Sequence, residues 1–438
     1  MNNFMSFLEK YFMPFAGKLA GQRHLQALRD GIVLAMPLII IGSIFLIIAF
    51  LPIPGYDDFM MNTFGDQWRD KLLYPQAATF GMMGLIACFG IAYRLAEKYD
   101  VDAVSAGAIA LCAFLLVTPF TVMFTPEGVE EAIAVGGAIP VALMGSSGLF
   151  VAMLIALFST EVYRFIIQKN IVIKLPEGVP PAVSKSFVAL IPGFVVIVLV
   201  WLIRLLVESF DINSLHDIVS IVLGKPLGLL GETLGGSVIA VALVQLLWSA
   251  GLHGMNIVGS VMSPVWLENS GENLIAFQAG ETLPHVFTST FFDVFVNIGG
   301  SGATFGLVIL MLLWAKSQQM KQLGKLSVGP GLFMINEPIV FGMPIVMNPL
   351  LIIPFFLVPI VNVITTYFAM ELGIVAKPSG VVIPWTTPPI IGGFLATNHL
   401  SGSFMQLFNI VVGFMIYLPF FKMWDNLKKK EETAAEQI

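Results

Sequence analysis

Long apolar runs separated by short polar loops dominate the chain. Five runs in the first half are each long enough to cross a bilayer as a helix. We place these five predicted spans at about residues 31–50, 76–93, 103–124, within 141–165, and 186–206. Residues 1–30 combine aromatic and basic side chains in an amphipathic pattern, which is typical of a helix lying on a membrane surface. The pattern predicts an all-α polytopic membrane protein.

The second half has a different pattern, because glycine, proline and asparagine interrupt its apolar runs. The sequence therefore divides into a first membrane part, a more polar external connection with an interfacial helix, and a second membrane part. We place these three parts at 1–210, 211–232 and 233–438. Interrupted segments in an otherwise helical membrane protein usually indicate a substrate site near the midplane.

Composition supports the membrane assignment. The chain is 57% hydrophobic and 11% charged, whereas soluble domains carry about 25% charged residues. Its net charge of −6 comes without a basic or aromatic-basic motif, so we expect no nucleic-acid partner. The two cysteines, Cys88 and Cys112, lie inside apolar runs, and no His/Cys cluster has metal-ligand spacing. We therefore expect no metal and no cofactor.

Loops rich in lysine and arginine alternate with acidic loops along the first half. Arg94 and Lys98 follow the second span, whereas three glutamates between residues 127 and 131 follow the third. Basic loops stay on the cytoplasmic side of a membrane, so we expect a multi-pass protein of the cell membrane with a cytoplasmic N-terminus. The lysine-rich tail at 422–430 predicts a cytoplasmic C-terminus as well.

The stretch 329–344 is apolar but holds three glycines, three prolines and one carboxylate, that of Glu337. Pro338 lacks an N–H group and disfavours helix at the residue before it. Non-helical backbone at membrane depth is tolerated only where protein buries it or where it lines a wet cavity, and an acidic group there is a candidate functional residue. The alternative is a short surface loop in which Glu337 is simply solvated.

Polar residues recur at helical spacing in the predicted span 235–256. They are spaced by four, four and three residues, which places them on one helix face: Gln245, Ser249, His253 and Asn256. The glycines on either side of Leu252-His253 leave room for a ligand to approach. Interhelical hydrogen bonding is the alternative explanation for Gln245 and Ser249.

Two further segments carry candidate ligand contacts. The run 299–303, which contains Gly300 and Ser301, can present backbone N–H groups to a ligand or an anion, although it has no Walker pattern. Trp385 precedes Thr386 in a proline-rich apolar stretch and can stack on a sugar ring. The alternative for Trp385 is an anchor at the membrane interface.

Three motifs together resemble a known family. Met334-Ile335-Asn336-Glu337-Pro338, Gly251-Leu252-His253-Gly254 and Pro384-Trp385-Thr386-Thr387-Pro388-Pro389 are similar to the membrane component, enzyme IIC, of sugar phosphotransferase systems. The resemblance covers essentially the whole chain. It is to the lactose/cellobiose/diacetylchitobiose branch, and within that branch to diacetylchitobiose permeases.

The resemblance implies a fold of about ten transmembrane helices with two re-entrant hairpins in the C-terminal half. It implies a homodimer formed through 1–210 and a disaccharide, diacetylchitobiose or cellobiose, bound within 233–438. A phosphorylated cytoplasmic IIB protein, on a separate polypeptide, would transfer phosphate from a phosphocysteine to the 6-hydroxyl of the sugar as it enters. The partners are thus the disaccharide, IIB, a second copy of the chain and membrane lipid.

The resemblance also implies roles for individual residues. Glu337 and His253 would be the catalytic residues beside the sugar hydroxyl, and which of them acts as base is left open. Asn336 and Trp385 would contact the sugar. The rest of the predicted substrate-binding set is Gln245, Asn256, Gly300, Ser301 and Thr386. The alternative function is a secondary active sugar transporter, with Glu337 as the protonated coupling group.

Overall fold

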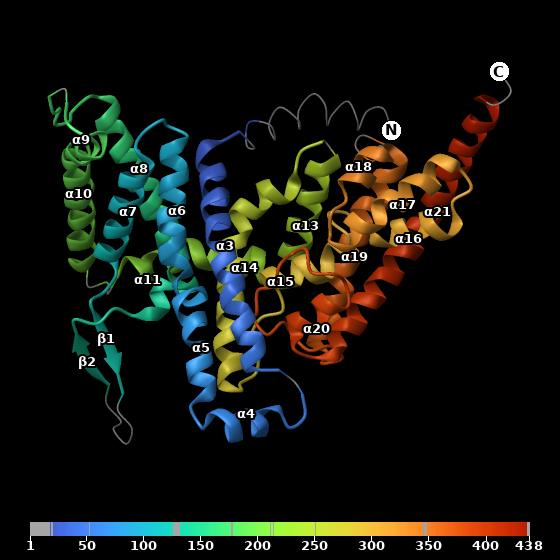
Figure 1. The fold of residues 1–438 in the computed structure, drawn as a ribbon, viewed down its shortest axis with the longest axis horizontal. Coiled ribbons are helices and arrows are strands. Elements are labelled where there is room, and N and C mark those ends of the chain that lie inside the picture. Colours follow the sequence, from blue (N-terminus) through green and yellow to red (C-terminus); the bar gives the residue numbers. More distant parts are fainter. Residues whose placement is uncertain are drawn as a thin grey trace. The chain divides into compact units, whose positions relative to one another are not determined.

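The computed structural model describes residues 18, 21–51, 53–125, 132–176, 178–210, 212, 214–249, 251–343, 345 and 348–435. The chain forms two compact units (Figure 1). One comprises Met1–Gly21, Ser43–Leu72 and Gly228–Ile438, and the other comprises Gln22–Gly42 and Leu73–Leu227. We call these the C-terminal unit and the N-terminal unit. Helix α3 (Arg23–Ala49) contributes residues to both.

Helices account for most of the described chain, and six are long and apolar enough to cross a membrane. These six are Arg23–Ala49, Trp68–Glu97, Ser146–Gln168, Val183–Glu208, Leu350–Glu371 and Leu400–Ala434. Shorter apolar helices, such as α16 (Phe305–Trp314), lie between them. The prediction of a helical multi-pass membrane protein is therefore confirmed.

The N-terminal unit is a bundle built around close helix contacts. Its main elements are α6 (Met83–Glu97), α7 (Ala103–Val117), α8 (Leu149–Gln168), α10 (Leu190–Glu208) and α11 (Leu215–Val219). A Cβ atom on Gly90 of α6 would lie 2.7 Å from the carbonyl oxygen of Gly31. Small residues of this kind let helix backbones approach closely in membranes.

The third predicted span is too long. Helix α7 ends at Val117, and Thr121–Phe124 form strand β1, which pairs antiparallel with β2 (Ile133–Gly136). The reason is Pro119, because a residue before proline is disfavoured in the helical region, and Thr118 is extended with ψ 138°. The predicted acidic loop between the strands falls on 126–131, outside the described residues.

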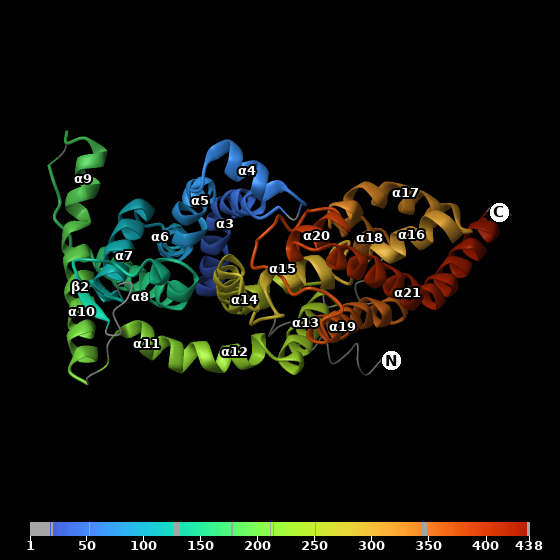
Figure 2. The same ribbon diagram turned by 90° about the horizontal axis from the view of Figure 1, so that it is seen from below.

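The C-terminal unit carries the helices that follow Gly228 in the chain. They are α13 (Leu234–Ser249), α14 (Gly254–Ala279), α15 (Ser289–Phe291), η6 (Phe292–Val296), α16, α17 (Gln318–Leu332), α18 (Glu337–Gly342), α19 (Pro349–Glu371), α20 (Ile391–Thr397) and α21 (Leu400–Ala435). Both α16 and α17 lie beside α21, which runs as one long helix from Leu400 to Ala435 (Figures 1 and 2). The α4 helix (Tyr56–Phe64) belongs to the same unit.

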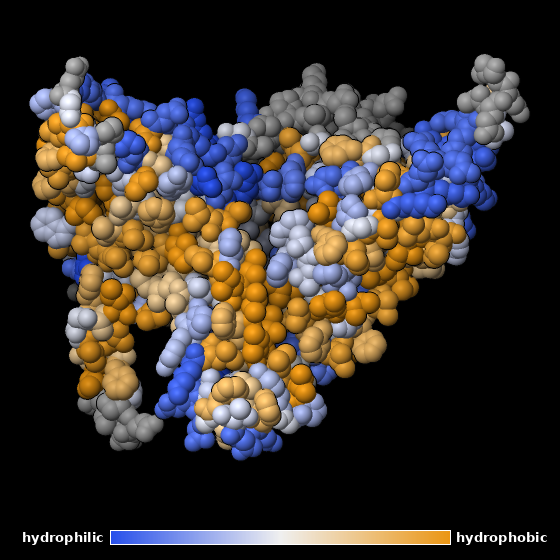
Figure 3. Space-filling model, in the orientation of Figure 1, coloured by the Kyte–Doolittle hydropathy of each residue, from blue (hydrophilic) through white to orange (hydrophobic). Residues whose placement is uncertain are grey.

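Surface hydropathy varies along α21. Apolar side chains such as Phe404 (69% exposed) and Met415 (58% exposed) cover its first part, and the surface there is orange in Figure 3. Hydrophilic residues, coloured blue, gather toward its C-terminal end. Exposed apolar side chains on a helix of this length fit contact with lipid.

Non-helical backbone separates η6 from α16, and side chains of two helices bond to carbonyl groups at the end of η6 and in this loop. Amide N–H groups donate to the carbonyl oxygens of three consecutive residues, and a tyrosine hydroxyl donates to a fourth carbonyl. The pairs are Gln406 to Val294 (2.8 Å), Asn409 to Phe295 (3.0 Å), Asn362 to Val296 (3.2 Å) and Tyr417 to Gly302 (2.7 Å). Such internal satisfaction is required where water is excluded.

Gln406 also satisfies a second irregular segment, which leads from α19 into α20. Its Oε1 accepts hydrogen bonds from the backbone N–H groups of Ile390 and Gly393, both at 2.6 Å. The side chain is fully buried. One glutamine thus joins the two irregular segments of the C-terminal unit.

We expect Gln406→Leu to destabilise the protein strongly. The change removes the partner of three backbone groups, two of them in buried contacts, and each unpaired buried group costs about 1–3 kcal/mol. Thermal unfolding of the purified protein in detergent should show a large fall in the midpoint. The control is Leu407→Ala at the next position, which is 46% exposed and should change the midpoint little. Equal midpoints for wild type and Gln406→Leu would contradict this account.

Candidate functional site

The loop between η6 and α16 has a backbone that requires glycine. Gly299, Gly300 and Gly302 have φ angles of +81°, +93° and +83°. L-residues with side chains rarely adopt this region. A Cβ atom on Gly302 would overlap the ring of Phe355, and one on Gly300 would lie 2.6 Å from Cγ of Asn336. The predicted glycine loop is therefore a tight turn packed directly against Asn336.

Asn336 joins this loop to the segment before α18. Its Nδ2 donates to the carbonyl oxygen of Ser301 at 2.5 Å, and the residue is only 4% exposed. Met334, with φ +62°, adds a second link, because its Sδ accepts from the N–H group of Gly299 at 3.0 Å. The structure thus brings Gly300, Ser301 and Asn336 together, although they are about 35 residues apart in the chain.

Glu337 is the first residue of α18 and is exposed. Pro338 follows it at a position where proline is well tolerated, because the first N–H groups of a helix have no intrahelical partner. The carboxylate of Glu337 makes no hydrogen bond or ion pair with another described residue. It is therefore available to a ligand beside the Asn336–Ser301 contact.

The predicted single helix face through Gln245, Ser249, His253 and Asn256 is wrong. Helix α13 ends at Ser249, and α14 starts at Gly254. The cause is the glycine pair around His253: Gly251 has φ +79°, and a Cβ atom on Gly254 would overlap the carbonyl oxygen of Val244. Gln245 and Ser249 are consequently buried, whereas His253 and Asn256 are exposed.

His253 is fixed by the turn that it occupies. It is the N-cap residue of α14, and its Nδ1 accepts from the backbone N–H group of Asn256 at 3.3 Å. A ring nitrogen that accepts must be unprotonated, so the proton of the neutral ring is on Nε2. The imidazole also packs on Trp248, with ring centroids 4.6 Å apart. These contacts hold the ring in one orientation.

Trp248 connects the histidine to α18. Its side chain is buried (6% exposed) in a core cluster that includes Ile339 and Val340 of α18. Glu337 is at the start of the same short helix. His253 and the helix that begins with Glu337 therefore both contact one packed cluster, although the chain separates the two residues by about 80 positions.

Gln245 and Ser249 have different environments. The hydroxyl of Ser249 donates to the carbonyl oxygen of Gln245, one turn earlier in its own helix, at 2.8 Å. The amide of Gln245 is fully buried, and neither of its polar atoms has a hydrogen-bond partner among the described residues. A buried amide in this state is costly, so stability alone does not account for Gln245.

Trp385 and Thr386 lie in the second irregular segment. The adjacent Thr387 closes a turn there, because its N–H group donates to the carbonyl oxygen of Pro384 at 2.9 Å. Trp385 is 51% exposed, Thr386 is half-buried, and the Trp385 ring contacts no other aromatic ring among the described residues. Stacking on a sugar stays a prediction for Trp385.

The structure adds Asp293 to the candidate residues. This half-buried carboxylate lies in η6, four residues before Asn297, whose Oδ1 is buried without a hydrogen-bond partner among the described residues. The signal in the sequence is a single aspartate within the apolar run 291–296. Ionisable residues in such runs are functional candidates, and our sequence analysis did not use this one.

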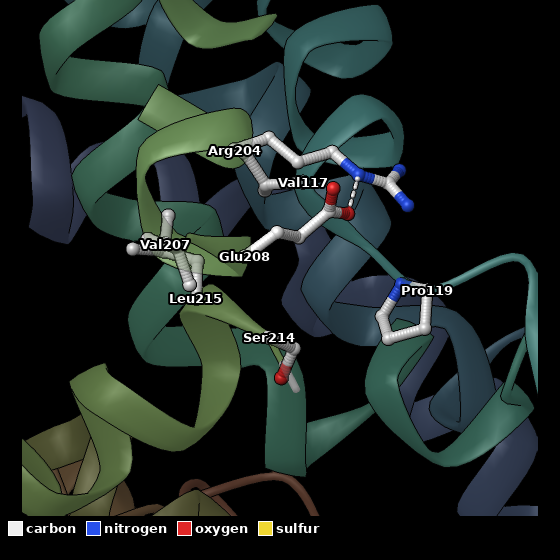
Figure 4. Close-up of a pocket in the computed structure, with 7 residues that line it drawn as sticks. All are labelled: Val117, Pro119, Arg204, Val207, Glu208, Ser214 and Leu215. Carbon is white, nitrogen blue, oxygen red and sulfur yellow. Dashed lines mark hydrogen bonds and ion pairs between the residues drawn. The ribbon is translucent and has the colours of Figure 1, made fainter. Parts of the chain in front are cut away.

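A pocket in the N-terminal unit has a structural explanation (Figure 4). It is lined by Val117, Pro119, Arg204, Val207, Glu208, Ser214 and Leu215. The Arg204 guanidinium donates to Glu208 Oε1 and to the carbonyl oxygen of Leu116, both at 2.8 Å. Leu116 is in the last turn of α7, where cations are favourable. Arg204 therefore caps a helix end, and none of the predicted site residues lines this pocket.

Comparison with known proteins decides the family. The sequence model described as "Phosphotransferase system, EIIC" matches residues 29–359. The chain belongs to this EIIC family. The family resemblance found in the sequence motifs is thereby confirmed.

Similar proteins match this EIIC chain almost end to end. The lichenan permease IIC component of Bacillus subtilis (strain 168) is 63% identical over 100% of this chain and 97% of its own length. The cellobiose-specific EIIC component of Geobacillus stearothermophilus is 60% identical, over 100% and 98%. The crystal structure of ChbC, the IIC component of an N,N'-diacetylchitobiose-specific phosphotransferase system, superposes with a TM-score of 0.94. It is 58% identical over 98% of this chain and 99% of ChbC.

A more distant relative differs in length. The lactose-specific EIICB component of Staphylococcus aureus (strain N315) is 34% identical over 97% of this EIIC chain, which covers only 73% of that protein. The rest of that EIICB protein lies outside the match.

We expect Gly300→Ala to destabilise the C-terminal unit. The added methyl group collides with Asn336 in a backbone conformation that alanine disfavours, and overpacking of this kind typically costs about 1–3 kcal/mol. The unfolding midpoint in detergent should fall. The matched control is Gly329→Ala, where a Cβ atom meets nothing within 4 Å. A Gly300→Ala midpoint equal to that of the control would show that the contact with Asn336 is not tight.

Proposed function

We propose that this EIIC protein carries a disaccharide, cellobiose or diacetylchitobiose, across the cell membrane while a IIB partner phosphorylates its 6-hydroxyl. The observation that carries the proposal is the contact between the 297–304 loop and Asn336, with the exposed carboxylate of Glu337 beside it. The similarity to cellobiose- and diacetylchitobiose-specific components supports the substrate class.

The chemistry requires positioning more than bond making. Phosphoryl transfer passes mostly through loose transition states, so the site orients the groups and balances charge. Glu337 would accept a hydrogen bond from the incoming hydroxyl and take its proton, because a carboxylate can serve as general base. His253 would hold the same hydroxyl or balance the developing charge. The reverse assignment of the two roles is equally compatible with the contacts described.

The remaining site residues would bind the sugar. The Nδ2 of Asn336 donates to the carbonyl oxygen of Ser301. The side-chain oxygen of Asn336 therefore remains as an acceptor for the sugar. The half-exposed Trp385 would stack on the C–H face of a ring. We assign hydrogen bonding to the other members of the set, which are Gln245, Asn256, Gly300, Ser301, Thr386 and the newly found Asp293.

The phosphate donor would be a phosphocysteine on a separate IIB protein. Relatives named only as EIIC or IIC are matched over 97–98% of their length, whereas EIICB is matched over 73%. This difference in coverage supports a phosphate donor that lies outside the region shared by the EIIC and EIICB proteins. Cys88 and Cys112 lie on apolar helices of the N-terminal unit, which suits neither for that task.

We further propose the membrane arrangement that the resemblance implies. It has ten transmembrane helices and two re-entrant hairpins, with both termini in the cytoplasm. Residues 1–210 would serve as scaffold and homodimer interface, 211–232 as an external connection, and 233–438 as the sugar-transporting part. The alternation of basic and acidic loops supports the orientation, and the two irregular segments, held by Gln406, support the hairpins.

Glu337→Gln should abolish most phosphorylation. The substitution keeps the volume and part of the hydrogen bonding but removes the base, and loss of a general base typically lowers the rate by about 10²–10⁴-fold. The measurement is sugar phosphate formed at saturating cellobiose or diacetylchitobiose in vesicles supplied with phosphorylated IIB. Glu281→Gln, at an exposed position after α14, is the control. His253→Gln should show a deficit at the same step, with non-additive effects in the double variant.

The same vesicles test the alternatives. Phosphorylation by Glu337→Gln within a few-fold of wild type would remove Glu337 from the chemistry. Accumulation of unmodified sugar without phosphorylated IIB would instead indicate a secondary transporter, and the proposed group translocation would be wrong.

Trp385→Ala should weaken disaccharide binding. Stacking on an aromatic ring is worth about 1–3 kcal/mol by analogy with base stacking. Titration calorimetry on the purified protein measures the dissociation constant, and Trp385→Phe should retain part of the affinity because it keeps an aromatic face. Unchanged affinity in Trp385→Ala would return this residue to the role of interface anchor.

A further inference from the structure

The start of α17 is held by a carboxylate from a distant part of the chain. Asp425 of α21 accepts hydrogen bonds from the backbone N–H groups of Lys316 (2.8 Å) and Ser317 (3.0 Å), one on each oxygen. Asp425 is only 2% exposed. Its charge is therefore satisfied by the turn between α16 and α17.

Glu432 extends this contact two helical turns later on α21. It accepts from the hydroxyl of Ser317 at 2.6 Å, and from the N–H groups of Gln318 and Gln319 at 3.1 and 2.9 Å. A separation of seven residues places Asp425 and Glu432 on the same face of a helix. The two carboxylates together accept five hydrogen bonds at one helix start.

Helix α17 depends on these contacts because its own first turn contains no acidic residue. The first N–H groups of a helix lack intrahelical partners, and negative charge beside them is favourable. Ser317 itself covers only the N–H group of Met320, at 3.3 Å. The start of α17 is therefore fixed mainly to α21.

The other end of α17 leads directly into the site. After its last residue, Leu332, the backbone turns tightly, and the N–H group of Ile335 donates to the carbonyl oxygen of Pro330 at 3.0 Å. Asn336 and Glu337 follow immediately. This short connection leaves little slack, so a shift of α17 along its axis displaces both site residues.

The contact between α17 and α16 permits such a shift. The buried residues of α17 are Met320, which packs in one core cluster with Met311 of α16, and after it three small residues, Gly324, Ser327 and Gly331. A Cβ atom on Gly324 would lie 2.7 Å from Cβ of Met311. Packed helices can slide by small shear movements, and the small buried residues after Met320 offer little side chain to block such a movement of α17. The anchoring at the start of α17 then sets where the helix rests.

We infer that Asp425 and Glu432 are positioning residues for the phosphoryl transfer. By fixing α17 to α21, they set the placement of Asn336 and Glu337 against the 297–304 loop. Neither carboxylate belongs to the candidate site, so both act through α17. This inference rests on the proposed function, because the placement of Asn336 and Glu337 matters only if the protein takes part in phosphoryl transfer.

The kinetic test uses Glu432→Ala with IIB-dependent phosphorylation in vesicles. We expect kcat to fall about 10–100-fold, the scale on which small misplacements act, while the dissociation constant of the disaccharide stays close to wild type. Glu432→Gln keeps one acceptor oxygen and should restore part of the rate. The matched control is Glu431→Ala, next to it on α21, whose carboxylate pairs with Lys428 at 2.8 Å and not with α17.

A distance measurement tests the anchoring without any sugar chemistry. Spin labels on cysteines replacing Leu326 of α17 (71% exposed) and Met423 of α21 (59% exposed) report the separation of the helices. Cys88 and Cys112 are replaced by alanine for this purpose. Glu432→Ala should broaden or shift the distance distribution, and Glu431→Ala should leave it unchanged. Ser317→Ala, which removes one Glu432 contact, carries the same expectation should Glu432→Ala fail to fold.

The outcomes separate the two proposals. Absence of sugar phosphate with the wild-type protein would defeat the proposed function, and the label distances would still report whether the carboxylates anchor α17. An unchanged distance distribution in Glu432→Ala and Ser317→Ala would overturn the inference. So would a kcat for Glu432→Ala equal to that of Glu431→Ala, or a loss that appears only as weaker sugar binding.

Discussion

The C-terminal unit depends on one constraint, which is that backbone carbonyl and N–H groups in an apolar setting need hydrogen-bond partners inside the protein. Helices meet this need by themselves, but the site requires backbone that is not helical. Side chains of α19 and α21 meet it around this backbone. Asn362, Gln406 and Asn409 bond to carbonyl oxygens of η6, where the helix ends, and Tyr417 bonds to Gly302 in the loop itself. Because these helices continue beyond the irregular segments, they hold the turns in place without supplying the groups that face a ligand.

This division of tasks leaves the residues of the irregular segments available. Gly300 closes the turn, because its N–H group donates to the carbonyl oxygen of Asn297 and its own carbonyl oxygen accepts from Ala303. The carbonyl oxygen of Ser301 accepts from Asn336. The carboxylate of Glu337 has no hydrogen bond to another described residue, although it begins a helix, where a carboxylate is favourable. Capping by distant amides therefore explains how an otherwise tightly packed unit can present an exposed carboxylate beside fixed backbone groups.

Sequence reasoning located the breaks near glycine and proline, such as the loop at Gly300 and the break before Pro338, because these residues act locally on φ. Pro338 itself lies in the first turn of α18, and Glu337 begins that helix. Sequence reasoning missed the break between α13 and α14. The spacing of Gln245, Ser249 and His253 fits a continuous helix, and the positive φ of Gly251 leaves no mark in that periodicity. The hydrogen-bond partners of the irregular backbone were also missed. The sequence does not show whether a buried glutamine such as Gln406 bonds to a carbonyl group in a loop or to a neighbouring helix.

The chemistry of the capping groups changes along α21, and the surroundings explain the change. Where the surface of the helix is apolar, the caps are neutral: Gln406, Asn409 and Tyr417. A carboxylate at that depth would carry a large desolvation cost. Where hydrophilic residues gather toward its C-terminal end (Figure 3), the caps are Asp425 and Glu432, and their charges also favour the start of α17. A single helix thus supports neutral turns in its first half and a charged helix start in its second, each with the group that its environment tolerates.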